Sequence, residues 1–286
     1  MRLKIYQQKL NDNIERAKSM VSTEVSLMFK DFYSYMHPLV NETFKGDIFG
    51  MDIPGSVCYS VGKCGKHNSG AIVTTAADAF RCMAIGVSRF YIPIDAEDNR
   101  EGLCISSAYE LASLLKEFDK VEVYGLITSG CLNEKHPSDE RLDFIWSSLK
   151  DVITSISLGG SYWLDRGFSL PGFVRDVRIG EYMIFGTIPF VEDKGRFGEC
   201  SVEIESEIVG VYPERSQFII DCGYSLAEPD KCVMNGMGAY FCDCSSEYSM
   251  FLKDDGVKDL HVGMKVSLRP NYKSLVKLRY AERVIV

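Results

Sequence analysis

A chain of 286 residues is long enough to bury one large core, or to form a barrel with a smaller second domain. Its net charge of −8 argues against nucleic acid or an anionic membrane as the main partner, and no apolar run approaches the roughly 20 residues of a membrane span. The ten cysteines stand singly among apolar residues and the N-terminus turns polar at once, so we expect reduced thiols in a cytoplasmic protein without a signal peptide.

Strand and helix patterns alternate along the first two thirds of the chain. Strands are expected at residues 3–6, 25–30, 56–61, 71–74, 89–95, 121–127, 152–158 and 174–178, the last continuing over 182–185. Helices are expected at residues 7–20, 39–44, 75–86, 107–117 and 138–149, the third capped by Thr75 and the fourth opened by a capping box at Ser107. This alternation indicates a parallel sheet, and the number of strands predicts a (β/α)8 TIM-type barrel.

The pattern changes near residue 202. Short alternating strands separated by turn residues are expected at 202–212, 216–222, 238–242, 249–252 and 265–268, with residues 192–198 as the connection. We therefore predict a barrel over residues 7–191, followed by an all-β domain over residues 192–286 that also includes residues 1–6.

The strand from Val25 ends on Lys30, with Tyr33 and Tyr35 just beyond it. A lysine at the end of a buried strand loses hydration, which lowers its pKa and favours the neutral amine that forms Schiff bases. Taken alone, this stretch is better explained by a lysine whose stem follows apolar surface until its charge reaches water.

Three motifs follow Lys30 in order: residues 95–102 (DAEDNREG), residues 156–161 (ISLGGS) and residues 177–181 (VRIGE). Together with residues 244–248 (CSSEY), they resemble the alanine racemase family of fold-type III pyridoxal-phosphate enzymes, most closely its ornithine racemase branch. The resemblance implies an isomerase that uses pyridoxal 5′-phosphate to racemise a small-molecule amino acid. Its mechanism would be two-base exchange of the α-proton through an aldimine at Lys30, in a homodimer with shared active sites.

The resemblance also implies a role for each matched residue. Lys30 would carry the cofactor and move the α-proton on one face of the substrate. Arg178 would face the pyridine nitrogen and keep it unprotonated, because a guanidinium has no acceptor. Gly180, Glu181 and Ser161 would hold the phosphate, the first two through backbone N–H groups, with the Glu181 carboxylate pointing away.

Other polar side chains complete the implied cofactor site. Arg100 would approach the phenolic oxygen of the cofactor and the substrate carboxylate. Tyr33 or Tyr35, with Tyr272, would supply phenolic donors; the spacing does not choose between the first two. An ordinary surface arginine and ordinary core tyrosines explain the same residues without a cofactor.

Proton transfer on the opposite face needs a second base, which the resemblance assigns to Tyr224 of the partner subunit. A phenol with a pKa of roughly 10 suits this task if a nearby positive charge lowers the pKa. A tyrosine at a turn after a strand is an equally good explanation. Cys222 and Tyr248 are the other candidates for this base.

The chain departs from the family between Lys30 and Asp95, where it is short and a glycine-rich stretch, residues 62–70, replaces a helix. Whether one strand of the barrel is lost with that helix is left open. Ser129 stands where a stacking residue is expected, and it cannot stack on a pyridine ring. Two alternatives remain open: a non-catalytic pyridoxal-phosphate-binding protein, and a fold-type III decarboxylase, against which Arg178 argues because decarboxylases place an acid at the pyridine nitrogen. No metal is expected, since the cysteines and histidine of residues 64–67 and 242–244 have no second pair at zinc-site spacing.

Overall fold

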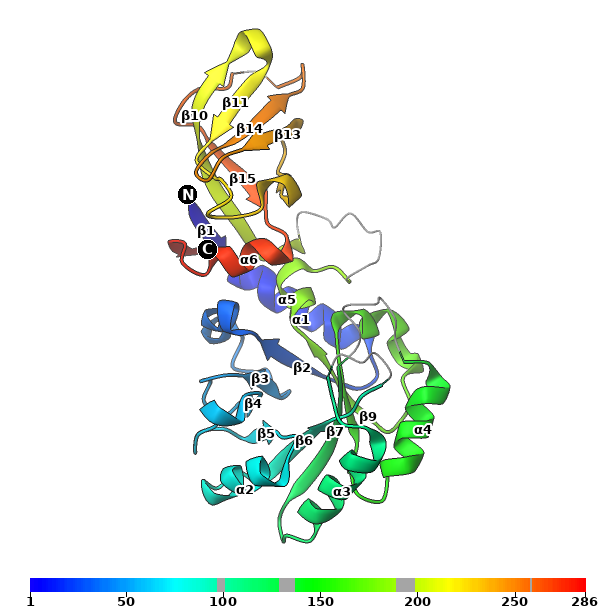
Figure 1. The fold of residues 1–286 in the computed structure, drawn as a ribbon. Helices are drawn as coiled ribbons and strands as arrows, with labels where there is room; N and C mark the ends of the chain where they lie inside the picture. Colours follow the sequence, from blue (N-terminus) through cyan, green and yellow to red (C-terminus); the bar gives the residue numbers. More distant parts are fainter. Residues whose placement is uncertain (97–100, 129–136, 189–198, 258) are drawn as a thin grey trace. The chain divides into compact units, whose positions relative to one another are not determined.

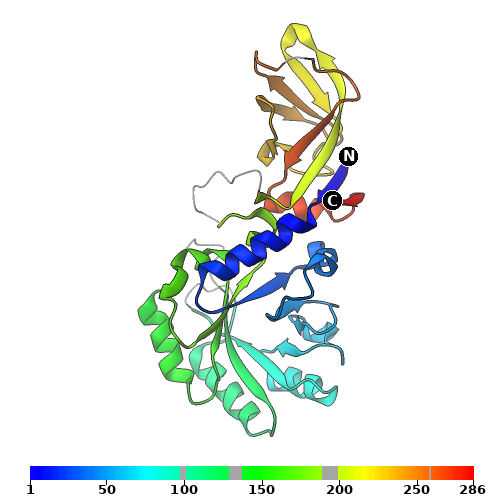
Figure 2. The same cartoon turned by 180° about the vertical axis from the view of Figure 1, so that it is seen from behind.

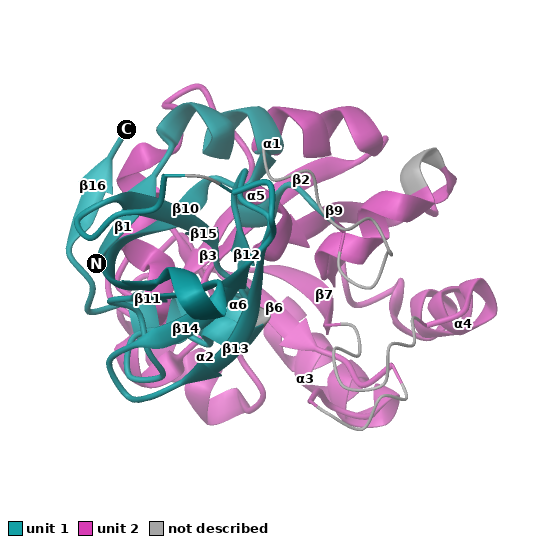
Figure 3. Cartoon of the chain, turned by 90° about the horizontal axis from the view of Figure 1, so that it is seen from above, with its two compact units in different colours: residues 1–13, 184–187, 193–286 teal, residues 14–183, 188–192 magenta. Residues whose placement is uncertain are grey.

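The computed structural model describes all residues except 97–100, 129–136, 189–198 and 258 (Figure 1). It divides into two compact units, coloured separately in Figure 3. The barrel unit contains residues 14–183 and 188–192, and the β unit contains residues 1–13, 184–187 and 193–286. Among the described residues, no helix has the length and apolar character needed to cross a membrane.

Eight parallel strands close the barrel, which confirms the predicted fold class. They are β2 (Glu24–Phe29), β3 (Ile48–Gly50), β4 (Val57–Cys58), β5 (Gly70–Ile72), β6 (Arg89–Pro93), β7 (Glu122–Thr128), β8 (Ile156–Gly159) and β9 (Val174–Ile179). The last strand pairs with the first, Leu27 opposite Ile179. No strand of the barrel is missing, and β3, which has only three residues, is the one that the hydrophobic pattern did not reveal.

Regular helices of nine or more residues follow three consecutive strands of the barrel, β5, β6 and β7 (Figures 1 and 2). They are α2 (Ala76–Ala84), α3 (Ile105–Lys116) and α4 (Asp139–Leu149). The predicted cap of α2 is confirmed, because Thr75 accepts a hydrogen bond from a backbone N–H group of the first turn. Ser138 caps α4 in the same way. The capping box at Ser107 is wrong, because α3 begins two residues earlier, after Cys104.

The described connections between β2 and β5 contain 3-10 elements and turns rather than α-helices. η1 (Asp31–Leu39) follows β2 and η2 (Val61–Lys63) follows β4, so the helix predicted at residues 39–44 is absent. Buried Asn68 holds the glycine-rich stretch, because its Oδ1 accepts from Gly65 N (2.9 Å) and its Nδ2 donates to Ser56 O (3.3 Å). These bonds satisfy buried backbone groups that a helix would otherwise have satisfied.

The remaining helical elements include α1 (Gln7–Met20), as predicted, η3 (Ser161–Ser169) after β8, and α5 (Glu181–Phe185) after β9. The strand predicted over residues 182–185 is therefore wrong. A short apolar run has no period of its own, so it fits a turn of helix as well as a strand.

The β unit is built on one eight-stranded sheet. Its strands are β1 (Arg2–Ile5), β10 (Val202–Tyr212), β11 (Gln217–Ile220), β12 (Val233–Met234), β13 (Ala239–Cys244), β14 (Ser249–Lys253), β15 (Lys265–Arg269) and β16 (Arg283–Ile285). The order is β12-β15-β10-β11-β14-β13, with β1 paired to β10 and β16. Short η5 (Pro213–Arg215), η6 (Pro229–Lys231) and helix α6 (Tyr272–Leu278) complete the unit, and Tyr272 is the first residue of α6.

Candidate active site

Lys30, Ser161 and Gly180 lie at the carboxyl ends of three neighbouring barrel strands. Lys30 directly follows β2, Gly180 directly follows β9, and Ser161 comes two residues after β8. β9 pairs with both β2 and β8. The structure thus brings the predicted lysine and two predicted phosphate ligands to one end of the barrel, where parallel α/β barrels carry their active sites.

Arg178 is buried inside the barrel, with 2% of its surface exposed. Its Nη1 donates to Ser157 Oγ (2.6 Å) and its Nη2 donates to Ile127 O (3.0 Å). Its guanidinium lies 5.3 Å from the centre of the Phe49 ring. The third nitrogen, Nε, is buried and has no hydrogen-bond partner in the described part of the chain.

The barrel interior lowers the pKa of Arg178 to about 10. Burial is the largest cause, because a charge loses its hydration there, and the negative charge of Asp176 opposes this effect most strongly. The guanidinium therefore stays charged near neutral pH although water is excluded.

Gly159 gives the Arg178 guanidinium its space. A Cβ on this residue would lie 2.5 Å from Arg178 Nη2, closer than any real Cβ contact. The next residue, Gly160, has a φ of +117°, which L side chains rarely adopt. The two glycines of residues 156–161 thus serve different purposes: one makes room for a side chain and the other turns the backbone toward Ser161.

Gly180 packs so closely against Tyr33 that there is no room for a side chain at this position. A Cβ on Gly180 would lie 2.7 Å from the Tyr33 hydroxyl and 3.1 Å from Met28 O. That hydroxyl is buried and donates to Met28 O (2.9 Å). Across the same strand ends, Ser161 Oγ accepts from Tyr182 N (3.1 Å). Ser161, Gly180 and the start of α5 therefore form one cradle of backbone and hydroxyl groups.

Glu181 lies in the same place, and its carboxyl interacts electrostatically with Lys30. Burial raises its pKa above the ordinary value, and the positive charge of Lys30 opposes the shift. Sequence analysis did not predict this pairing of the lysine with a carboxyl.

Four sequence predictions lie elsewhere. Arg100 and Ser129 fall outside the described residues. Tyr224 and Tyr272 belong to the β unit, where Asn271 caps the helix that Tyr272 begins.

Tyr224 is 47% exposed. Its pKa is raised, first by a hydrogen bond to the Cys244 thiol and then by the negative charge of Asp230. Lys277 Nζ lies 5.3 Å from its ring centre and donates to its carbonyl oxygen (2.8 Å). Within this chain Tyr224 is therefore accessible, and its proton is held more firmly than in free tyrosine.

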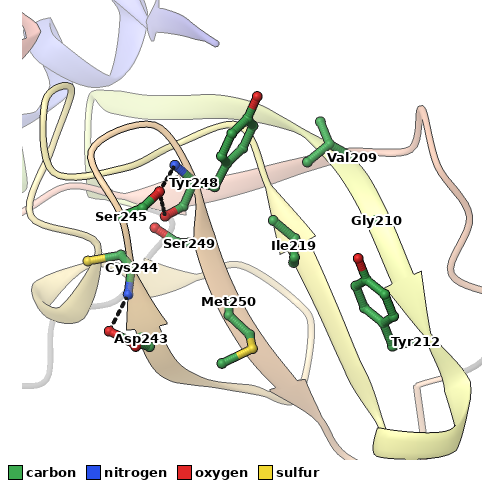
Figure 4. Close-up of a pocket in the computed structure, with 10 residues that line it drawn as sticks. All are labelled: Val209, Gly210, Tyr212, Ile219, Asp243, Cys244, Ser245, Tyr248, Ser249 and Met250. Carbon is green, nitrogen blue, oxygen red and sulfur yellow. Dashed lines mark hydrogen bonds between the residues drawn. The ribbon is translucent and has the colours of Figure 1, made fainter.

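The two alternative bases differ in access. Cys222 is fully buried, which raises the pKa of its thiol to about 12 and makes it a poor base. Tyr248 is 46% exposed and lines a hollow of about 540 Å³ on the sheet face of the β unit (Figure 4). Val209, Ile219 and Met250 give this hollow an apolar floor, and Tyr212 lies at its far side.

Sequence reasoning missed a polar group that surrounds Arg178. Ser26, Ser157 and Asp176 are all fully buried within the barrel. Asp176 and Arg178 are two residues apart on β9 and so point to the same face. The observation that could have revealed the group is a pair of charges on one face of a strand expected to be buried on both faces.

No protein-family model matches the sequence, and no curated protein matches it. The structure, in contrast, is similar to the alanine racemase from Corynebacterium glutamicum (TM-score 0.73, 13% identity, covering 100% of this chain and 99% of that one). It is also similar to D-threo-3-hydroxyaspartate dehydratase from Delftia sp. HT23 (0.67, 14%, 100% and 94%) and to D-threonine aldolase from Filomicrobium marinum (0.70, 14%, 98% and 89%). The chain thus has the fold of alanine racemase, as the motifs predicted. A racemase, a dehydratase and an aldolase share this fold, so the fold alone does not choose the reaction.

Proposed function

We propose that this chain is a pyridoxal-phosphate-dependent amino-acid racemase that binds its cofactor through Lys30. The observation that carries the proposal is Arg178: a charged side chain inside the barrel with a buried Nε–H that has no acceptor among the described residues. An unpaired buried donor is costly unless a ligand satisfies it. An unprotonated pyridine nitrogen is an acceptor of the right kind.

The other residues at the strand ends fit the rest of this cofactor. Lys30 supplies the amine that joins the aldehyde. The cradle of Ser161, Gly180 and Glu181 offers a hydroxyl and backbone amides for the phosphate, and Tyr33 packs beneath it. When bound, pyridoxal phosphate supplies an electron sink for charge that develops at the substrate α-carbon.

Arg178 favours racemisation over the alternatives. Its guanidinium cannot accept a proton or give one up near neutral pH, so it keeps the pyridine nitrogen unprotonated. By keeping that nitrogen unprotonated, Arg178 would make the bound cofactor a weaker electron sink, which would disfavour decarboxylation, a reaction that profits from an acid at the same nitrogen. The preference for a racemase over a decarboxylase rests on this residue.

Inversion needs proton transfer on both faces of the α-carbon. Lys30 takes or returns the proton on one face, and we assign the other face to Tyr224 of the partner subunit in a homodimer. Arg100 holds the substrate carboxylate, and Tyr272 adds a phenolic hydrogen bond. Tyr33 supports the cradle by packing, because its hydroxyl already donates to Met28 O. A second base is needed because one base cannot reach both faces of a substrate fixed in its site.

Borohydride trapping tests the cofactor assignment. The protein is mixed with pyridoxal phosphate, reduced, digested and mapped by mass spectrometry, and we expect the phosphopyridoxyl group on Lys30. Lys30→Ala should abolish labelling, whereas Lys45→Ala, at an exposed lysine before β3, should leave it unchanged. Labelling spread evenly over surface lysines would contradict the assignment.

The reaction is tested by incubating single amino acids in deuterated water. A racemase substrate loses its optical rotation while it gains α-deuterium. Release of CO2 would indicate a decarboxylase, and formation of a keto acid or an aldehyde would indicate a dehydratase or an aldolase. Trapping on Lys30 with no α-exchange in any amino acid would favour the non-catalytic binding protein.

A further inference from the structure

Asp176 lies next to Arg178 in the barrel interior and has no role in the function proposed above. Its carboxyl is fully buried, and Ser26 Oγ donates to its Oδ2 (2.5 Å). Its Oδ1 has no hydrogen-bond partner in the described structure. Ser157, which accepts from Arg178 Nη1, pairs with Asp176 in the β8–β9 register. Ser157 therefore lies between the carboxyl and the guanidinium.

We propose that Asp176 and Ser157 are positioning residues that hold Arg178 as a charged donor with its Nε–H reserved for the ring nitrogen of the cofactor. The inference rests on the proposed function. We call this group the Asp176–Ser157–Arg178 relay: Arg178 donates to Ser157, Ser157 is paired with Asp176 in the strand register, and Ser26 donates to Asp176. Asp176 acts on Arg178 through its negative charge.

The bonds of Arg178 explain why Nε is the donor that remains. Ser157 engages Nη1 and Ile127 O engages Nη2, so two of the three nitrogens are fixed. Gly159 lies against Nη2 and supplies the space that this orientation needs. Loss of the Ser157 bond would free the planar guanidinium to rotate about its stem.

Charge balance explains why Asp176 is needed. A buried guanidinium without an anion is strongly unfavourable. The negative charge of Asp176 is the largest influence that opposes the loss of the Arg178 proton, ahead of Tyr91, Glu101 and Tyr162. Arg178 and the two serine hydroxyls in turn oppose the burial that raises the pKa of Asp176.

Two ligands that differ only at the ring nitrogen test the proposal. They are pyridoxal phosphate and its carbocyclic analogue, in which C–H replaces that nitrogen, and dissociation constants are measured by equilibrium dialysis. The wild type should prefer pyridoxal phosphate by about tenfold or more, since one hydrogen bond to a charged group is lost with the analogue. Asp176→Asn and Ser157→Ala should reduce the preference to about twofold or less, with both ligands still bound through the phosphate.

Two control variants remove similar groups elsewhere in the same barrel. Asp47→Asn removes an arginine-bonded carboxyl, and Ser56→Ala removes a buried serine bonded to Gly50 O and Ile53 O. Both should keep the tenfold preference. A ratio of two affinities does not respond to a uniform loss of folded protein, so a merely structural role for Asp176 would leave it unchanged.

Each outcome has one meaning. If the wild type binds neither ligand, the proposed function fails. If the wild type binds both ligands equally, or if both Asp176→Asn and Ser157→Ala keep its preference, the positioning role is refuted. If Asp176→Asn does not fold, Ser157→Ala decides alone: a retained preference refutes the relay and a lost preference supports it.

Discussion

Asp47 and Asp176 are acidic residues of the same barrel, each beside arginines, and they differ in how their hydrogen bonds are completed. Asp47 precedes β3 at the amino end of the strands. Its Oδ1 accepts from Arg89 Nη1 (2.6 Å), and its Oδ2 accepts from Arg175 Nη2 (2.7 Å) and from the Tyr91 hydroxyl (2.8 Å). Asp176, nearer the carboxyl end, keeps one oxygen without a partner among the described residues.

The contrast separates two uses of buried charge. The Asp47 group is complete within the protein, which is what a cluster that stabilises the fold requires. The group around Arg178 is incomplete at one atom of each charged residue, which costs folding free energy and leaves a donor for a ligand. The same barrel thus contains one charged group whose hydrogen bonds are completed within the protein and another that leaves a donor for a ligand.

The largest expected effect tests whether the group around Asp47 stabilises the fold. Asp47→Asn should lower the free energy of unfolding by about 3 kcal/mol, because two partly buried arginines lose their anion. The double variant Asp176→Leu/Arg178→Met should lower it by less than half as much, since apolar residues replace an ion pair that is already incompletely bonded. Urea unfolding of the cofactor-free protein measures both. Equal losses would show that the two groups do not differ in this way.

Gly159→Ala tests the group around Arg178, which we propose is prepared for a ligand. Its Cβ would meet Arg178 Nη2 at 2.5 Å, so the guanidinium must move, and we expect a loss of about 2 kcal/mol in unfolding free energy. The variant should also lose the preference for a ring nitrogen. Gly172→Ala is the matched control, because no atom lies within 4 Å of its Cβ position. If Gly159→Ala kept the wild-type preference for pyridoxal phosphate over the carbocyclic analogue, this preference would not depend on the position of the Arg178 guanidinium.

Gly180→Ala tests the cradle at the carboxyl end. Its Cβ would lie 2.7 Å from the Tyr33 hydroxyl, so we expect about tenfold weaker binding of pyridoxal phosphate and little change for pyridoxal, which lacks the phosphate. Adding Tyr33→Phe removes the nearest contact and should restore part of the affinity. Equal weakening for the two ligands would place the phosphate elsewhere.

The smallest effect concerns pH. Burial raises the pKa of Glu181 in the folded state, so its stabilising contribution is complete below its unfolded pKa of about 4.3 and is lost as the pH rises through the folded value. Glu181→Gln should therefore raise the melting temperature by about 2 °C at pH 7 and leave it unchanged at pH 4.

Glu140, in the first turn of α4, is the control with the opposite sign. Backbone and Ser138 hydrogen bonds lower its pKa, so its contribution is present above the unfolded pKa and is lost as the pH falls. Glu140→Gln should lower the melting temperature at pH 7. A decrease with both variants would show that Glu181 is not held in an unfavourable charged state.

Sequence patterns predicted the barrel but not the strand β3. α1, α2 and α4 are long enough to show the helical period, and β10 is a long strand whose predicted bounds match the structure. β3 has three residues, too few for any period, and its place in the barrel depends on pairing with its neighbours.

The candidate site was predicted where a motif fixes a residue at a strand end, as for Lys30, Ser161 and Gly180. The partners of Arg178 were not predicted, because serine and aspartate inside a strand are more typical of an exposed face. Only closure of the barrel turns Ser26, Ser157 and Asp176 inward together. Their role depends on strand register, which no local pattern in the sequence specifies.

The pairing of β1 has a consequence for how the chain is made. β1 is synthesised before the barrel, but it pairs with β10 through Leu3 and Ile204 and with β16 through Leu3 and Arg283. About 200 residues, including the whole barrel, leave the ribosome before the first partner strand exists, which takes about 10 to 40 s at ordinary rates of translation. The barrel can complete its own local contacts during that interval, whereas β1 waits as an unpaired strand edge. A slow, late-closing sheet makes the β unit, rather than the barrel, the part of the nascent chain most exposed to misfolding.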